Sequence, residues 1–374
     1  MSERAKTDVN VEIKQRAGLI ADECSSREVQ VSRETSWRRR PGARVREQIG
    51  GDFDACRICV GRFANHVGTA EMCLPGESFV TEPLYVTYEL LEEGTIARIM
   101  LNRPNSRNAQ NRGLLVELND AFLQAEADDE VRVVILGGMG PMFSAGHDMG
   151  SKAAIEESRS HPTVSINGGT RKGAEKRMLQ EWHYYFENTR RWRNLRKITI
   201  AQVHGDVYAG GLMLIWACDL IVCADNVTFA DVVGSRMGMC GVEYFAHPWE
   251  FGPRKTKELM LTGDSLSVEE AYQLGMVSKI FKEEELAQRT LEYAQRIAKM
   301  PTMAALLIKE SVNQTVDNMG FYNALNACFT LHELNHSHWA ELHDNKVPIA
   351  LEEDGVESWR NAPPVVPAAK DRVR

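Results

Sequence analysis

The sequence predicts an α/β fold made of parallel βαβ units, and three observations support this prediction. Alternating apolar residues in Val86–Leu90 and Ile96–Met100, separated by a Glu-Glu-Gly turn, indicate a hairpin of two strands. Leu114, Leu115, Leu118, Phe122 and Ala125 then recur at helical spacing. The run Val131–Gly138 is almost continuously apolar, which is typical of a strand buried on both faces. The order strand, helix, strand implies parallel pairing.

The second half of the chain continues this alternation. A polar stretch, Ser151–Arg177, predicts a loop or lid, and an amphipathic helix is expected over Met178–Leu195. Two more buried strands are predicted at Ile198–Val203 and Leu220–Cys223, with a glycine-rich turn and a short apolar helix between them. After Thr262 the pattern is helical, and Ser267 with Glu270 forms a capping-box signature.

Composition excludes some classes of function. The formal charge of −8 argues against a general nucleic-acid binder, because such proteins need a basic face. The sequence contains no apolar run of membrane-spanning length, and its first residues alternate in charge where a signal peptide would be apolar, so we expect a cytoplasmic protein without membrane partners. Eight cysteines in 374 residues are sparse, which favours reduced thiols.

Five segments, in their order and spacing, resemble the enoyl-CoA hydratase/isomerase (crotonase) family. They are Leu101–Asn111 (LNRPNSRNAQN), Phe143–Ser151 (FSAGHDMGS), Ile200–Asp231, Glu258–Phe281 and Met300–Gln314. The resemblance covers residues 86–345. It implies a ClpP/crotonase-like spiral of ββα units, C-terminal helices in a homotrimer or dimer of trimers, and an acyl-CoA substrate. No cofactor is expected, because coenzyme A is part of the substrate.

This resemblance divides the chain into four parts. Residues 1–84, which lack sustained apolar periodicity, are expected to be a poorly ordered or irregular extension. The crotonase core is expected over residues 85–275, a C-terminal helical region over 276–346, and a proline- and charge-rich tail over 347–374.

Two glycine-containing turns carry the expected chemistry. By resemblance, the backbone N–H groups of His147 in AGHD and Gly210 in AGGL hold the thioester carbonyl, and such a pair stabilises an enolate as negative charge develops. Gly210 also opens a helix, whose dipole would add to the same site. For either motif alone a simple turn is the stronger interpretation. As a matched pair they favour an oxyanion hole.

The segment SRNAQ is expected to border coenzyme A. Arg107 could bind a CoA phosphate, whereas Asn108 is equally consistent with a side chain that ties the turn to its own backbone. The remaining residues expected at the substrate are Ala109, Ala145, Asp148, Gly211, Met213 and Val233.

The sequence departs from the family pattern at the two glutamates that hydratases use to add water. Their positions are occupied by Met213 and Val233, which cannot transfer a proton. Candidate replacements are Asp231, Glu243, His247 and the imidazole of His147. The structural alternatives are that Glu243 caps a helix or pairs with Arg254, that His147 packs in a turn, and that Asp148 caps a helix.

Two patterns resemble metal sites. HELNH, His332–His336, matches the H-E-x-x-H zinc pattern, with Glu352, Glu353 or Glu357 as a third ligand, but it falls in the C-terminal helical region of the family. The other pattern is zinc-ribbon-like and consists of Cys56, Cys59, His66 and Cys73. We expect no metal.

The leading hypothesis is therefore an acyl-CoA thioester enzyme of the hydratase family that works through a stabilised enolate. An isomerase, or a thioester or C–C hydrolase with a single base, is the alternative that the missing glutamates favour. A non-catalytic acyl-CoA binder is the alternative from another class.

Overall fold

A computed structural model describes residues 84–149, 151, 152, 154 and 171–344. Several predicted parts lie outside these residues. They are the N-terminal extension up to residue 83 with its cysteine–histidine pattern, most of the predicted lid, and the tail. The four described cysteines, Cys218, Cys223, Cys240 and Cys328, form no disulfide with one another.

The core is a six-stranded sheet of order β1-β2-β3-β4-β6-β9, which confirms the α/β prediction. The hairpin strands pair antiparallel and every later neighbour pairs parallel. The strands are β1 (Val86–Leu91), β2 (Ile96–Leu101), β3 (Val133–Gly138), β4 (Ile198–Val203), β6 (Leu220–Ala224) and β9 (Lys279–Phe281). A second sheet contains β5 (Asp206–Tyr208), β7 (Thr228–Ala230) and β8 (Leu266–Ser267).

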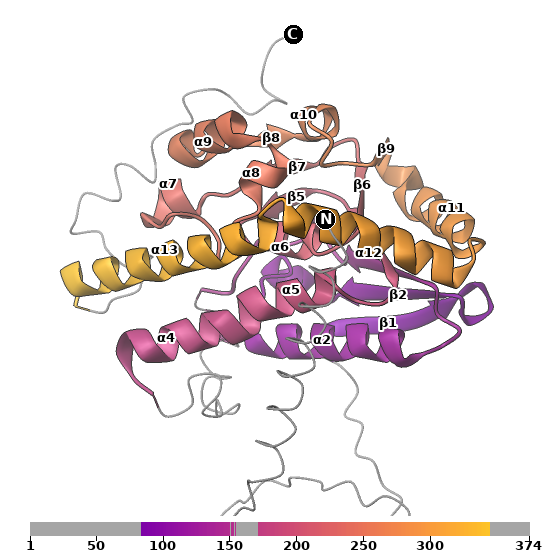
Figure 1. The fold of residues 1–374 in the computed structure, drawn as a ribbon, viewed down its shortest axis with the longest axis horizontal. Helices are drawn as coiled ribbons and strands as arrows, with labels where there is room; N and C mark the ends of the chain where they lie inside the picture. The colour runs from indigo at the N-terminus through magenta and orange to yellow at the C-terminus, as the bar shows by residue number, and fades with distance from the viewer. Residues whose placement is uncertain (1–83, 150, 153, 155–170, 345–374) are drawn as a thin grey trace, which may run out of the picture. The chain divides into compact units, whose positions relative to one another are not determined.

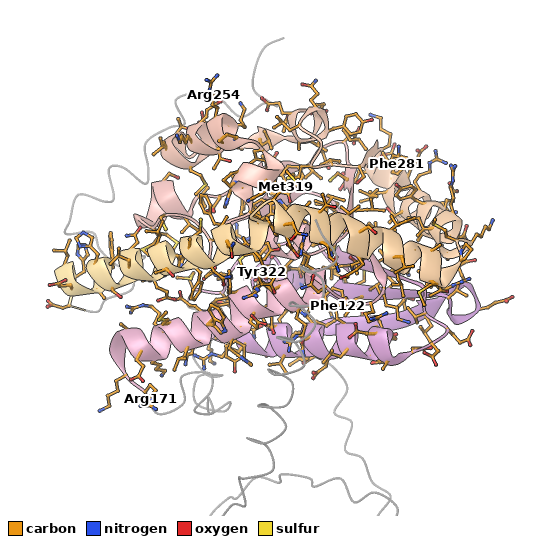
Figure 2. All side chains as sticks on the ribbon, viewed as in Figure 1. Phe122, Arg171, Arg254, Phe281, Met319 and Tyr322 are labelled. Carbon is orange, nitrogen blue, oxygen red and sulfur yellow. The ribbon has the colours of Figure 1, made fainter. Side chains whose placement is uncertain are left out.

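Helix α2 (Arg112–Ala127) makes the first crossover, between β2 and β3. It begins at Asn111, whose side chain accepts a hydrogen bond from the Leu114 N–H at 3.2 Å and so satisfies a backbone donor of the first turn. Phe122, labelled in Figure 2, lies on its buried face. It packs against Trp192, with ring centroids 5.6 Å apart. Short 3₁₀ turns, η1 (Glu92–Gly94) and η2 (Pro104–Ser106), flank β2.

A long helical run precedes β4 and confirms the predicted amphipathic helix. It consists of the α-helix α4 (Gly173–Glu181), the π-helical segment η4 (Trp182–Glu187) and the α-helix α5 (Asn188–Arg193). The residues at both junctions have helical backbone angles, so the three elements form one continuous run. A π segment inserts an extra residue into the helical ladder and often marks a functional position. Here it carries Tyr185.

The remaining helices include the predicted C-terminal helical region, and the capping box at Ser267 and Glu270 is confirmed. They are α6 (Gly210–Trp216), α7 (Val233–Met237), α8 (His247–Glu250), α9 (Pro253–Thr262), α10 (Val268–Gln273), η5 (Glu283–Glu285), α11 (Leu286–Ala298), α12 (Thr302–Asn318) and α13 (Phe321–Leu342).

Helix α13 lies beside the run from α4 to α5 (Figure 1). The guanidinium of Arg190 stacks over the Tyr322 ring, 4.0 Å from its centroid, and joins the two elements. Lys309 fixes α12 to the sheet, because its Nζ donates to the Lys197 carbonyl and pairs with Asp219 at 2.9 Å. These contacts hold the C-terminal helices over the core. Among the described residues, no helix is long and apolar enough to span a membrane.

Candidate active site

The two predicted oxyanion turns meet in the structure. Ser144 forms a parallel bridge with Val207, and the Tyr208 N–H donates to the Ser144 carbonyl at 3.0 Å. A Cβ on Gly146 would lie 2.8 Å from the Tyr208 oxygen and 3.0 Å from the Gly210 nitrogen. Only glycine permits this approach at position 146, because its φ of +88° also lies in the left-handed region.

The backbone turns sharply just before Gly210. Ala209 has φ 47° and ψ −117°, an unfavourable conformation for a residue with a side chain, and such strain is concentrated at functional sites. Among the hydrogen bonds of the described residues, none is donated by the N–H of His147 or by that of Gly210. Both donors of the expected pair are therefore available to a substrate oxygen.

The His147 imidazole covers this turn and faces a buried carboxylate. A Cβ on Gly210 would lie 2.5 Å from the ring atoms Cδ2 and Nε2. His147 Nδ1 lies 3.5 Å from Glu243 Oε1, and the ring stacks on Tyr185 with centroids 3.8 Å apart. His147 Nε2 and Glu243 Oε2 are buried, and neither has a hydrogen-bond partner within the described structure. An imidazole and a carboxylate thus lie together beside the two backbone donors.

Burial raises the pKa of Glu243, although the neighbouring His147 and His332 act in the opposite direction. Its side chain is only 5% exposed. A carboxylate with few compensating hydrogen bonds is a stronger base than an exposed one, which suits it to proton transfer. A salt bridge between Glu243 and Arg254 was one of the structural alternatives, and the contacts of the described residues do not include it.

A second group of ionisable side chains adjoins Glu243. His332 Nε2 lies 3.9 Å from Glu243 Oε1 and 3.2 Å from Glu181 Oε2. His336 Nε2 lies 3.6 Å from the other oxygen of Glu181. Glu181 also lines a cavity of about 190 Å³ together with Tyr184, Tyr185 and the basic residues Arg112, Lys176 and Arg177. The cavity gives this cluster a route to solvent.

Asp231 is placed differently from Glu243, because both of its oxygens have partners. Oδ1 accepts from the Val233 N–H at 2.9 Å, and Oδ2 accepts from the Val242 N–H at 3.1 Å and from His247 Nε2 at 3.0 Å. Burial acts to raise the pKa of Asp231, but the hydrogen bonds from His247 and the two amides outweigh it and lower the pKa. These contacts tie the loop after β7 to α8.

The positions of the two family glutamates are apolar in the structure. Met213 is buried within α6, and Val233 is the half-buried first residue of α7. Neither offers a group that can transfer a proton. Any acid–base chemistry must come from other side chains.

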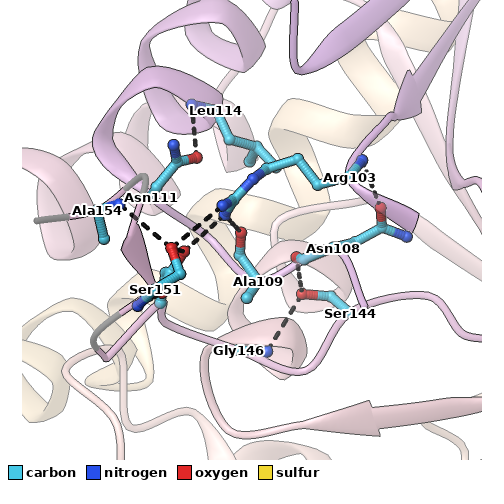
Figure 3. A network of polar contacts seen from close by, with 10 residues as sticks. Arg103, Asn108, Ala109, Asn111, Leu114, Ser144, Gly146, Ser151 and Ala154 are labelled. Carbon is cyan, nitrogen blue, oxygen red and sulfur yellow. Dashed lines mark hydrogen bonds and ion pairs between the residues drawn. The ribbon is translucent and has the colours of Figure 1, made fainter. Parts of the chain in front are cut away.

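The predicted coenzyme A segment contains one structural residue (Figure 3). The Asn108 amide donates to the carbonyls of Met139, Met142 and Phe143, and its oxygen accepts from the Arg103 N–H at 2.9 Å. These bonds favour the structural interpretation of Asn108. Arg107 precedes it in the left-handed region with φ 53° and has an exposed side chain.

Arg103 is a buried residue that the sequence did not single out. Its guanidinium pairs with Asp148 at 2.9 Å and also donates to the Ala109 carbonyl. Asp148 accepts a hydrogen bond from Ser151 Oγ at 2.6 Å as well. The pair joins the turn after β2 to the AGHD turn, so Asp148 fixes the backbone that presents the His147 N–H.

Ala145 and Gly211, which were also predicted to border the substrate, help to hold the two turns together. The Ala145 N–H donates to the Arg107 carbonyl at 2.9 Å, which joins the coenzyme A segment to the oxyanion turn. A Cβ on Gly211 would lie 2.8 Å from the Ser144 oxygen, so glycine allows α6 to pack against this turn. Sequence reasoning missed Glu181 and Tyr185, which occur in no motif and reach the site through the fold alone.

Comparison with known proteins agrees with the fold. Residues 92–346 match the enoyl-CoA hydratase/isomerase family. The chain is 63% identical over 292 residues to the Mycobacterium tuberculosis protein named "Putative enoyl-CoA hydratase EchA13". The aligned region covers 77% of this chain and 92% of the relative. It is 32% identical over 254 residues to 4-chlorobenzoyl coenzyme A dehalogenase-2 of Arthrobacter sp, covering 66% and 85% of the two chains.

A solved structure shows the same architecture. The crystal structure of a probable enoyl-CoA hydratase from Mycobacterium smegmatis superimposes with a TM-score of 0.63 at 40% identity, covering 71% of this chain and 99% of that one. The protein belongs to the enoyl-CoA hydratase/isomerase family and has the crotonase fold, as the sequence predicted. It is an acyl-CoA enzyme of that family.

The contacts of Asp231 predict a structural effect when it is changed. Asp231→Asn should lower the free energy of unfolding at pH 7 by roughly 1–3 kcal/mol, because it weakens hydrogen bonds to a charged group. The pKa of Asp231 in the folded protein lies below its usual 3.8, so its stabilisation is complete above that pH and is lost as pH falls through the lowered pKa. The difference between variant and wild type should therefore shrink below about pH 3.8.

Urea denaturation from pH 7 to pH 3, with activity measured on the folded variant, tests this assignment. Turnover should stay within about tenfold of wild type, well short of the loss that follows removal of a catalytic base. A variant of unchanged stability that loses turnover would instead identify Asp231 as catalytic.

Proposed function

We propose that this protein hydrates enoyl-CoA thioesters, with the Glu243–His147 pair in place of the two family glutamates. The observation that carries the proposal is the 3.5 Å contact between His147 Nδ1 and Glu243 Oε1 beside two unoccupied backbone donors. Hydration needs one group to remove a proton from water and one to deliver a proton to the α-carbon. A carboxylate in contact with an imidazole supplies both.

The proposed reaction begins with the thioester carbonyl accepting hydrogen bonds from the N–H groups of His147 and Gly210. Glu243 removes a proton from water as the water oxygen bonds to the β-carbon, and the double-bond electrons move into a thioester enolate. The two N–H groups stabilise the enolate oxygen. The proton then passes through the Glu243–His147 contact to the α-carbon, so that one water is added and the pair is restored.

The cavity beside Tyr185 supports a polar or aromatic acyl group. Aromatic Tyr184 and Tyr185 and basic Arg112, Lys176 and Arg177 line it, which suits a ring or an anionic group better than a long alkyl chain. One relative is named as acting on a 4-chlorobenzoyl thioester. Substrate panels should therefore include aromatic and carboxylated enoyl-CoA thioesters, in the cytoplasmic setting that the sequence suggests.

An isomerase is the second candidate, because the same pair can move one proton between two carbons of an acyl-CoA without water. Product mass separates the candidates. Hydration gives an intact thioester one water heavier, isomerisation leaves the mass unchanged, and hydrolysis frees coenzyme A. Saturable binding without any product would support a non-catalytic binder.

Replacement of Glu243 tests the assigned base. Glu243→Gln should lower kcat by roughly 10²–10⁴-fold with little change in KM, because the amide keeps the shape of the side chain and cannot accept the proton. The matched control is Glu258→Gln on the exposed face of α9, which should retain wild-type kcat. The proposal fails if Glu243→Gln turns over enoyl-CoA at the wild-type rate while remaining folded by circular dichroism.

Exposed apolar side chains on the C-terminal helices support a homotrimer or dimer of trimers. Met303, Leu307, Ile308, Val312 and Met319 on α12 or its end are each more than half exposed. Isolated apolar residues are common on surfaces, but a stripe at helical spacing is typical of a subunit contact.

Charges placed on this stripe should dissociate the assembly. Leu307→Glu combined with Ile308→Glu should reduce the mass in sedimentation velocity to that of one chain, because burying two carboxylates in an apolar contact is unfavourable. Leu261→Glu, on the exposed surface of α9, serves as the control and should leave the assembly intact. A monomeric wild-type protein would contradict the proposal.

A further inference from the structure

Three potential metal ligands converge beside the proposed acid–base pair. His332 and His336 lie one turn apart on α13, and Glu181 reaches them from the end of α4. One ligand atom from each lies within 4.8 Å of the others. His332 Nε2 and His336 Nε2 lie 3.2 Å and 3.6 Å from the two oxygens of Glu181. Small adjustments of these side chains would bring all three atoms around one ion.

The structure orients His332 as metal-bound histidines are usually oriented. Its Nδ1 lies 2.8 Å from the Gly241 carbonyl, which can only accept, so the proton of a neutral ring is on Nδ1. Nε2 lies 3.2 Å from Glu181 Oε2 and would give up its proton, with its lone pair free for the ion, when a metal binds. Metal-ligating histidines commonly donate their other ring N–H to such a carbonyl, which fixes the ring and the tautomer.

Two further acidic side chains lie beside the three ligands. Glu243 and Glu333 are buried, and Glu243 Oε1 lies 3.9 Å from His332 Nε2. The surroundings of the three ligand atoms are therefore rich in oxygen ligands that suit a divalent cation.

We propose that Glu181, His332 and His336 bind one divalent first-row metal ion, for which Zn²⁺ is the best match. Two imidazole nitrogens and one carboxylate oxygen are a zinc ligand set, and three protein ligands leave a position for water or substrate. No metal was expected from the sequence, because HELNH falls in the C-terminal helical region of the family and Glu181 belongs to no motif. The structure supplies the third ligand from α4, because Glu181 lies 151 residues before His332 in the sequence.

Zinc binding is measured directly, so the result does not depend on the proposed hydration. The full chain, stripped with a chelator and dialysed, is titrated with ZnCl₂ by calorimetry, and retained zinc is counted by mass spectrometry. One zinc per chain is expected. Co²⁺ in its place should give the visible absorption of a four- or five-coordinate ion.

Variants locate the ion. His336→Gln and Glu181→Gln should each weaken zinc binding by at least about tenfold, since even loss of an outer-shell partner costs 10–100-fold. His338→Gln, exposed on the same helix, should bind as wild type does. Circular dichroism confirms that each variant is folded. The proposal is overturned if the wild type retains no zinc, or if both ligand variants retain it equally, which would place the ion elsewhere in the chain.

Discussion

The close approach of two backbone turns is the constraint on which the site depends. Gly146 must lack a side chain, because a Cβ there would lie 2.8 Å from the Tyr208 oxygen, and a Cβ on Gly210 would lie 2.5 Å from the His147 ring and displace it. The strained conformation of Ala209 costs on the order of 1–3 kcal/mol, and neighbouring strands offset it. Its N–H donates to the Ala230 carbonyl at 2.9 Å, while Tyr208 bonds to Ser144. The strand pairing thus holds the two turns that carry the N–H groups of His147 and Gly210 close together.

Acid–base groups reach this point from parts of the chain that are distant in sequence. Glu243 comes from the loop after α7, Tyr185 from the π-helical turns, and His332 from α13. The family positions after the second oxyanion turn and on the following loop carry Met213 and Val233 instead. Burial with few compensating hydrogen bonds raises the pKa of Glu243, which suits this carboxylate to proton transfer. The same fold can therefore support enolate chemistry with a different set of proton carriers.

Local patterns were sufficient to predict the fold and the two turns. The apolar run of β3, the spacing on α2 and the capping box at Ser267 each dictate their own element, and the order of five motifs indicated the family. The site was only partly predictable. Glu243 and His147 were among the candidates, but nothing in the sequence distinguished Glu243 from Asp231, because the difference is whether the fold supplies hydrogen-bond donors to the carboxylate. Glu181 and Arg103 act through contacts with residues 151 and 45 positions away, which no spacing rule encodes.

The central claim is that the backbone donors and the Glu243–His147 pair act on the same acyl group. A crystal structure of the protein with a bound enoyl-CoA substrate analogue tests it most directly. The thioester oxygen should accept hydrogen bonds from the N–H groups of His147 and Gly210 at about 3 Å, with Glu243 as the carboxylate nearest the β-carbon. A thioester bound away from these two donors, or a β-carbon that faces Asp231 instead of Glu243, would contradict the account.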